Sequence, residues 1–122
     1  MLATRARVLI VDDNPQILRF IELCLRSHDY QVVTAGSGAE GLEILASGSL
    51  DIILLDIRMP DMDGFQFMAR AAEVGQWPVI AYSASPEYAA QAIEAGAVAF
   101  LSKPLDLNHL TGMLDEFAAA RA

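Results

Sequence analysis

The sequence predicts an α/β protein built on a parallel sheet that helices cover on both faces. Five short apolar runs alternate with five segments in which apolar residues recur every three or four positions. Most of the short runs are nearly continuous in Val, Ile and Leu, a pattern typical of parallel strands that are buried on both faces. The alternation of strands with helices implies right-handed crossovers between parallel strands.

The expected strands follow the apolar runs along the chain. They are Val8–Val11, Gln31–Ala35, Ile52–Leu55, Val79–Tyr82 and Val98–Leu101. No run approaches the roughly 20 apolar residues that a membrane-spanning helix needs, so we expect no membrane insertion. The first run is also too short for a signal peptide, because Asp12 and Asp13 end it. We therefore expect a cytoplasmic protein.

The expected helices have matching start signals. The apolar stripes of the first and last helices consist of Ile17, Phe20, Ile21, Cys24 and Leu25, and of Leu107, Leu110, Leu114 and Phe117. The other three helices are expected over Ala39–Ala46, Phe65–Ala72 and Glu87–Ala95. Pro15 suits the first turn of the first helix, with Asp13 or Asn14 as the cap. Ser37 and Glu40 have the spacing of a capping box for the second helix.

The charge balance argues against one broad class of ligand. Eight basic residues stand against sixteen acidic ones, for a formal net charge of −8. Nucleic-acid binding depends on neutralising phosphates with Lys and Arg, so we expect no direct contact with DNA or RNA. The length of 122 residues suits one domain. The lone cysteine, Cys24, is expected to pack in the core on the apolar face of the first helix.

Polar side chains stand where four of the five strands end. Asp12 and Asp13 close the first strand, Asp56 the third, Ser83 the fourth and Lys103 the fifth. In open α/β sheets, ligands bind beyond the carboxyl ends of the strands, where the strand order reverses. If the order is 2-1-3-4-5, strands one and three are neighbours at that reversal, and the three aspartates converge.

Three converging carboxylates predict a bound cation or a retained proton. Two unit charges about 4 Å apart repel by about 4 kcal/mol at an effective dielectric constant near 20, so one carboxyl keeps a proton or a metal ion is held. Oxygen ligands without His or Cys favour Mg²⁺. Lys103 adds a positive charge that suits phosphate, and Ser83 adds a hydroxyl donor. Such groups around one carboxylate form a phosphoryl-binding site that contains a nucleophile.

Four segments resemble, in order and spacing, the receiver domains of two-component signalling. They are VLIVDDN at 8–14, LLDIRMPDMDG at 54–64, YSA at 82–84 and FLSKP at 100–104. The resemblance runs through essentially the whole chain. It implies a flavodoxin-like (βα)5 three-layer sandwich with strand order 2-1-3-4-5, and a single receiver domain over residues 1–122 with no effector domain visible.

The resemblance implies a signalling role rather than turnover of a substrate. Asp56 would accept a phosphoryl group from a sensor histidine kinase, a histidine phosphotransfer protein or a small phosphodonor, in a Mg²⁺-dependent step. Asp13 would ligate Mg²⁺ directly and Asp12 largely through water, and the backbone carbonyl of Arg58 would be a further protein ligand. The domain would catalyse only its own phosphorylation and dephosphorylation.

The resemblance also implies a switch that responds to phosphorylation. Ser83 would be drawn toward the phosphoryl group, Phe100 would rotate into the vacated space, and Lys103 would pair with the phosphoryl oxygens. The face made by helix four, strand five and helix five would then control an unknown downstream protein. Two expectations are particular to this chain: the Arg58 side chain tunes dephosphorylation, and the loop after strand four is trimmed by a residue or two.

Other functions fit parts of the pattern. Phosphatases with an aspartyl nucleophile usually place a second aspartate two residues later, where this chain has Arg58. A phosphorylation-independent interaction module on the same fold need not keep Asp12, Asp13, Asp56 and Lys103. Flavin-binding proteins of this fold carry a phosphate loop after the first strand, where the two aspartates would repel the flavin phosphate.

Some residues also have simpler interpretations. Asp12 and Asp13 could cap the first helix, Ser83 could be an ordinary turn hydroxyl, and Phe100 could be plain core. The sequence does not identify the kinase, the downstream partner or the oligomeric state. It also leaves open whether the receiver stands alone or belongs to a longer chain, although the closeness of Met1 to the first strand favours a natural start.

Overall fold

Five parallel strands form one sheet in the order β2-β1-β3-β4-β5 in the computed structural model, which describes residues 6–119. The strands are β1 (Arg7–Val11), β2 (Gln31–Ala35), β3 (Ile52–Asp56), β4 (Val79–Ser83) and β5 (Ala99–Ser102). Each pairs in parallel with its neighbours in the sheet. The expected flavodoxin-like order is confirmed, and the order reverses between β1 and β3.

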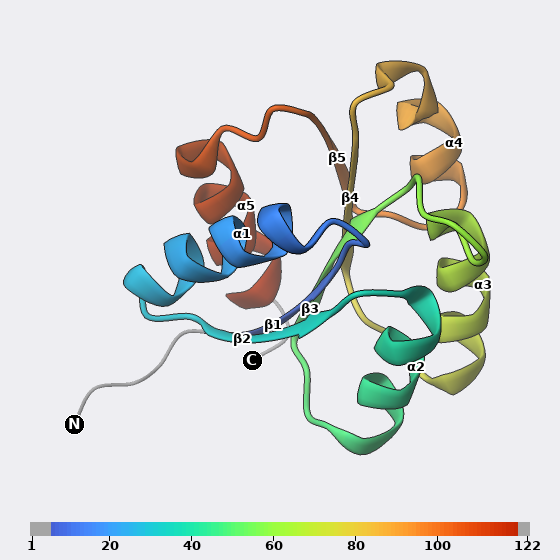
Figure 1. Ribbon diagram of the computed structural model, residues 1–122, viewed down its shortest axis with the longest axis horizontal. Coiled ribbons are helices and arrows are strands. Elements are labelled where there is room, and N and C mark those ends of the chain that lie inside the picture. The colour runs from blue at the N-terminus through green and yellow to red at the C-terminus, as the bar shows by residue number, and fades with distance from the viewer. Residues whose placement is uncertain (1–5, 120–122) are drawn as a thin grey trace.

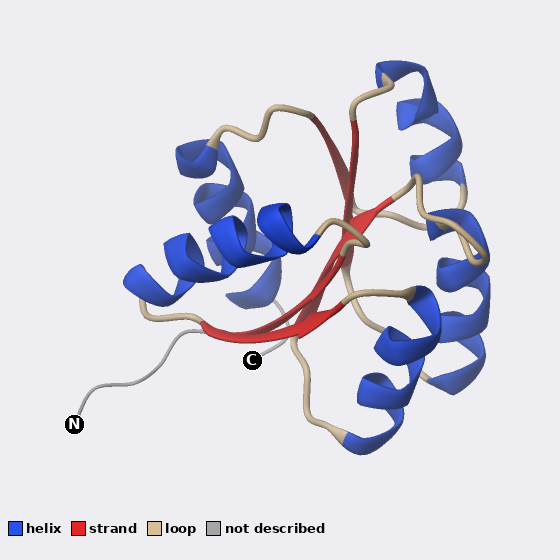
Figure 2. Ribbon diagram, in the orientation of Figure 1, coloured by secondary structure: helices blue, strands red, loops and turns tan. Residues whose placement is uncertain are grey.

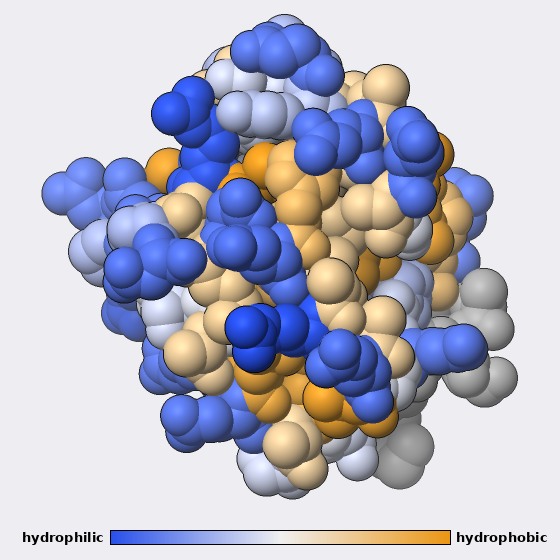
Figure 3. Space-filling view, turned by 90° about the vertical axis from the view of Figure 1, so that its right-hand side faces the viewer, coloured by the Kyte–Doolittle hydropathy of each residue, from blue (hydrophilic) through white to orange (hydrophobic). Residues whose placement is uncertain are grey.

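Helices cover both faces of the sheet, so the protein has three layers (Figures 1 and 2). On one face lie α1 (Pro15–Ser27) and α5 (Leu107–Ala119). On the other lie α2 (Gly38–Ser47), α3 (Gly64–Val74) and α4 (Ala89–Glu94). Seen from the side of these three helices, the surface mixes hydrophilic and hydrophobic residues (Figure 3). Within residues 6–119, no helix is both long and apolar enough to cross a lipid bilayer.

The side chains of the central strands divide between two hydrophobic cores. All five residues of β3 and all five of β4 are buried, as the continuous apolar runs predict. Successive side chains point to opposite faces of the sheet. Ile53, Leu55 and Ala81 therefore enter the core under α2, α3 and α4, whereas Leu54 and Tyr82 enter the core under α1 and α5.

The predicted apolar stripe of α1 was wrong at one residue, Phe20. Ile21 and Leu25 are buried and Cys24 is half-buried, but Phe20 is 56% exposed. Phe20 lies about 100° around the helix from Ile21, which carries it beyond the face that contacts the sheet. Cys24, at the margin of that face, is therefore only partly in the core.

The segment after β4 does not form the single helix that the period predicted over Glu87–Ala95. A short 3₁₀ turn, η1 (Pro86–Tyr88), comes first, and α4 (Ala89–Glu94) follows it. The Tyr88 N–H donates to the Ser85 carbonyl at 3.2 Å, the closure of a 3₁₀ turn. No side chain caps the start of either element, so no capping hydrogen bond stabilises an α-helix that begins at Glu87.

Polar caps hold the loops that surround the carboxyl edge of the sheet. Asn14, one of the two residues predicted as the cap of α1, accepts the N–H groups of the next turn through its Oδ1. Asp63 and Gln66 form a capping box at the start of α3. Gly64 donates its N–H to the Ile57 carbonyl at 2.8 Å, and a Cβ there would lie 2.8 Å from the Ile57 Cα. Only glycine allows this tight closure of the β3–α3 loop.

Candidate functional site

The three aspartates that close β1 and β3 meet at the carboxyl edge of the sheet. Asp12, Asp13 and Asp56 each offer a carboxylate oxygen, and these oxygens all lie within 4.8 Å of one another. The cluster forms where the strand order reverses, because β1 and β3 are neighbours and both end at this edge. Asp12 and Asp56 are buried, whereas Asp13 is exposed. Solvent therefore reaches the cluster from the side of Asp13.

Lys103, which follows β5, completes the cluster. Its Nζ lies 3.6 Å from Asp56 Oδ2 and 3.8 Å from Asp12 Oδ2. Both distances exceed that of an ordinary hydrogen bond, so the ammonium group is shared between two carboxylates. One lysine offsets only part of the charge of three aspartates.

Asp12 is held by donors on both of its carboxylate oxygens. The backbone N–H of Asn14 donates to Oδ1 at 2.9 Å, and the hydroxyl of Tyr82 donates to Oδ2 at 2.6 Å. The second distance is typical of a hydrogen bond to a charged acceptor. The Lys103 Nζ also lies 5.1 Å from the centroid of the Tyr82 ring, within reach of a cation–π contact.

Tyr82 was not predicted as a site residue. The sequence does carry a signal for it, because a tyrosine stands in a run that predicts complete burial, and a buried phenol requires a hydrogen-bond partner. What the sequence does not show is that the partner is Asp12, which lies 70 residues away. Burial and the nearby Asp12 carboxylate raise the pKa of Tyr82 well above 10, so its hydroxyl stays protonated and acts as a donor.

The surroundings of Asp56 shift its pKa upward. Burial raises the pKa of Asp56 from 3.8 to about 7, and the Asp12 carboxylate contributes to the rise. Lys103 and the backbone N–H of Arg58, which lies 3.3 Å from Asp56 Oδ1, lower the pKa in part. The carboxylate form of Asp56 is thus poorly stabilised by the protein alone, and an added cation would favour it.

The donor set fits Mg²⁺. All three groups in the cluster are carboxylates, the hard oxygen ligands that this ion prefers. Mg²⁺ also keeps several of its waters and takes few protein ligands. The exposure of Asp13 leaves room for such waters, whereas Asp12 already accepts two hydrogen bonds.

The two residues expected to form a switch lie on the neighbouring strands β4 and β5. Ser83 is buried at the end of β4, and its Oγ accepts the backbone N–H of Ser85 at 3.0 Å. Phe100 is half-buried and packs against the core under α2, α3 and α4. In the β4–β5 ladder it is paired with Ala81, two residues before Ser83.

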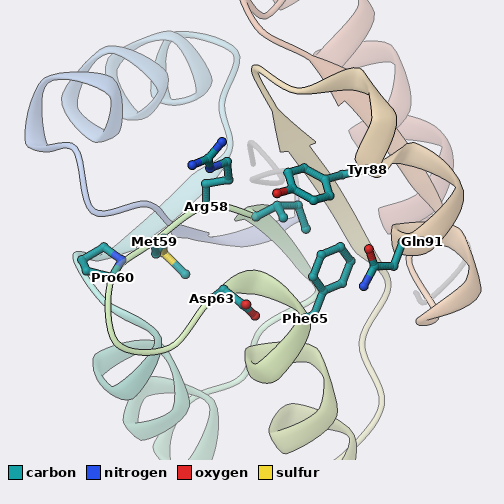
Figure 4. A pocket seen from close by; sticks show the side chains of 8 residues that line it. Arg58, Met59, Pro60, Asp63, Phe65, Tyr88 and Gln91 are labelled. Carbon is teal, nitrogen blue, oxygen red and sulfur yellow. The ribbon is translucent and has the colours of Figure 1, made fainter.

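Arg58, two residues after Asp56, is exposed and borders an open pocket of about 610 Å³ between the β3–α3 loop and α4. Phe65 and Tyr88 line the same pocket, and their rings meet edge to face at 5.8 Å. Figure 4 shows Arg58 at one end of the pocket and Gln91 at the other. The Arg58 side chain is therefore exposed to solvent at this pocket, two residues after Asp56 along the chain.

Comparison with known proteins supports the resemblance found in the sequence. Residues 8–115 match the family model of the response regulator receiver domain. The chain is 41% identical over 115 residues to the transcriptional regulatory protein GlrR of Escherichia coli strain K12, an alignment that includes 91% of this chain and 26% of that protein. This chain thus spans about a quarter of the length of that curated relative.

Solved structures share the fold over nearly the whole chain. A receiver domain protein from Clostridium thermocellum superposes with a TM-score of 0.89 at 26% identity, covering 95% of this chain and 96% of that one. The receiver domain of the sensor histidine kinase PA1611 from Pseudomonas aeruginosa gives a TM-score of 0.84 at 27% identity, covering 95% and 99%. That structure has a magnesium ion coordinated in its active site cleft.

Proposed function

Because this chain belongs to the response regulator receiver domain family, we propose that it is a phosphoacceptor in a two-component pathway and that Asp56 receives the phosphoryl group. The observation that carries the proposal is the placement of Asp56. This aspartate ends β3 among two other aspartates and lies 3.6 Å from the Lys103 ammonium group. The donor would be the phosphohistidine of a sensor kinase or of a histidine phosphotransfer protein, and the location would be the cytoplasm.

The acidic cluster would hold Mg²⁺ during the transfer. Asp13 and Asp56 would ligate it through their carboxylates, the backbone carbonyl of Arg58 would add a third protein oxygen, and Asp12 would act through water. When bound, Mg²⁺ offsets negative charge on the acceptor and on the transferring group. The magnesium ion in the receiver domain of PA1611 supports this assignment.

The chain's own residues would then position and stabilise the reacting groups. An oxygen of Asp56 forms a bond to phosphorus while the bond from phosphorus to the histidine nitrogen breaks. Asp56 must be ionised to act as a nucleophile, and Lys103 favours that form. Lys103 would turn from the carboxylates to the phosphoryl oxygens, and Ser83 would donate a hydrogen bond to the same group.

Phosphorylation would bias a two-state element next to the site. Ser83 would give up its contact with the β4–η1 loop when it turns to the phosphoryl group, and Phe100, on the adjacent strand, would rotate into the vacated space. A shift from a minor to a dominant population needs a few kcal/mol of differential interaction, and two charge-assisted contacts are of that order. The face of α4, β5 and α5 would then bind a downstream protein.

The test is the intact mass of the protein after incubation with acetyl phosphate, with and without Mg²⁺. We expect wild type to gain the mass of one phosphoryl group only when Mg²⁺ is present, and Asp56→Asn to gain none. An adduct on Asp56→Asn would place the acceptor elsewhere. No adduct on wild type, from acetyl phosphate or from a phosphorylated histidine donor, would favour an interaction module that works without phosphorylation.

Replacing Arg58 by alanine is expected to shorten the lifetime of the acyl phosphate by up to about fivefold, because an exposed ionic contact is worth at most about 1 kcal/mol. The exposed guanidinium group, two residues after Asp56 along the chain, would otherwise contact the phosphoryl oxygens and limit the approach of water. The lifetime is measured by following loss of the adduct mass after removal of the donor. Arg70→Ala, an exposed position on α3, is the matched control. Equal lifetimes for wild type and Arg58→Ala would exclude this tuning role.

A further inference from the structure

Tyr82 places a phenol hydroxyl inside the protein, where a purely apolar side chain would fill the core at no polar cost. The residue is completely buried and belongs to the core under α1 and α5. A buried hydroxyl destabilises the folded state unless it has a hydrogen-bond partner. The partner of Tyr82 is the buried carboxylate of Asp12, so the polar group is placed for an interaction with the acidic cluster.

The length of the tyrosine side chain matters for this contact. β3 separates β4 from β1 in the sheet, and two strand spacings amount to roughly 10 Å. Tyr82 pairs with Asp56 in the β3–β4 ladder, so its ring passes beside the end of β3 to reach the residue that follows β1. A Leu or Val at this position would fill less of the distance and would offer no donor.

The contact restricts how Asp12 presents its oxygens. With Oδ1 held by the Asn14 N–H and Oδ2 by the Tyr82 hydroxyl, the carboxylate plane cannot rotate without breaking a hydrogen bond. In this orientation an oxygen of Asp12 lies within 4.8 Å of an oxygen from each of Asp13 and Asp56. The Tyr82 ring also faces the Lys103 ammonium group at 5.1 Å.

We propose that Tyr82 is a positioning residue of the metal site. Through its hydroxyl, Tyr82 holds the Asp12 carboxylate in the orientation in which Asp12 assists Mg²⁺ binding. The proposal rests on the proposed function, since it assumes that the cluster binds Mg²⁺. β4 would then contribute to metal binding through Tyr82, in addition to carrying Ser83 at its end. Outer groups that orient metal ligands typically contribute about tenfold or more to metal affinity.

The test compares Mg²⁺ dissociation constants, measured by isothermal titration calorimetry, for wild type and Tyr82→Phe. We expect Tyr82→Phe, which keeps the ring and loses only the hydroxyl, to bind Mg²⁺ about tenfold more weakly. Tyr88→Phe removes a hydroxyl from a half-buried tyrosine before α4 and is expected to leave the constant unchanged. With acetyl phosphate, Tyr82→Phe should need about tenfold more Mg²⁺ for half-maximal rate while reaching a similar maximal rate.

A double-mutant cycle separates positioning of Asp12 from a general structural effect. If Tyr82 acts through Asp12, the hydroxyl has no further influence once Asp12→Ala has removed the carboxylate that accepts its hydrogen bond. Tyr82→Phe should then change the Mg²⁺ constant of Asp12→Ala by less than about twofold. An equal loss in both backgrounds would overturn the proposal.

The outcomes distinguish this inference from the proposed function. Wild type that binds no Mg²⁺ would refute the metal site itself. Wild type that binds Mg²⁺ with the same constant as Tyr82→Phe would refute the role of Tyr82 alone. Should Tyr82→Phe not fold, the wild-type protein still provides a test, because the NMR signals of the Tyr82 ring must shift along the Mg²⁺ titration. Signals that stay unchanged at saturation would overturn the proposal.

Discussion

Replacing Asp56 by asparagine is expected to raise the free energy of unfolding of the metal-free protein by about 2 kcal/mol near pH 8. The cause is the pKa of Asp56, which burial and Asp12 raise from 3.8 to about 7 in the folded state. At about 1.4 kcal/mol for each pH unit between the two pKa values, the upper bound is about 4 kcal/mol. We expect about half of it, because solvent enters beside the exposed Asp13.

The pH dependence of this difference has a defined sign. Below about pH 3, Asp56 is protonated in both the folded and the unfolded chain, so the variant has no advantage. Between pH 4 and pH 7 the unfolded chain loses the proton while the folded protein keeps it. Wild type therefore loses stability across this window relative to Asp56→Asn, and the difference levels off above about pH 7.

Urea denaturation in EDTA, repeated from pH 4 to pH 8, measures this difference. Asp29→Asn is the matched control, since it removes one negative charge from an exposed turn whose left-handed backbone (φ 70°) asparagine tolerates. Its stability should stay within about 0.5 kcal/mol of wild type at every pH. A difference between Asp56→Asn and wild type that does not vary with pH would contradict the raised pKa.

The parts of the site that depend on strand order were predictable from the sequence. Buried parallel strands appear as continuous apolar runs, and parallel strands bring their carboxyl ends to one edge. Asp12, Asp13 and Asp56 were expected to meet there on this basis, and they do. Lys103 joins them because β5 ends at the same edge.

What the sequence did not show depends on angles and distances between elements. The helical period places Phe20 near the apolar stripe, but the width of the face that the sheet covers decides its exposure. The period after β4 likewise does not show where a 3₁₀ turn at Pro86 precedes the α-helix. The bond from Tyr82 to Asp12 crosses two strand spacings, and no local pattern encodes it.

Lys103→Met is expected to slow the phosphorylation of Asp56 by acetyl phosphate about 100-fold at saturating Mg²⁺. Methionine keeps much of the length of the side chain and removes the ammonium group, with both its charge and its hydrogen-bond donors. The ammonium group lies 3.6 Å from Asp56 Oδ2, close enough to follow the phosphoryl oxygens as they arrive. A positioned donor aimed at charge that develops in the transition state typically contributes 100-fold or more.

The comparison with Lys103→Arg shows what the lysine contributes. Arginine restores the positive charge, but its planar guanidinium group distributes that charge over a wider fork than the compact ammonium group. The site leaves little space for such a fork, because Lys103 Nζ already lies within 3.8 Å of both Asp12 and Asp56 and 23% of its side chain is exposed. We expect Lys103→Arg to recover part of the rate, about tenfold over Lys103→Met.

Saturating Mg²⁺ separates the effect on transfer from an effect on metal binding. Removal of Lys103 strengthens the net negative charge of the cluster, so Lys103→Met should bind Mg²⁺ at least as tightly as wild type. A slower transfer in a variant that holds the metal as well as wild type assigns the loss to the phosphoryl group. Wild-type rates for Lys103→Met at saturating Mg²⁺ would show instead that the ammonium group serves only to balance Asp12 and Asp56 in the resting state.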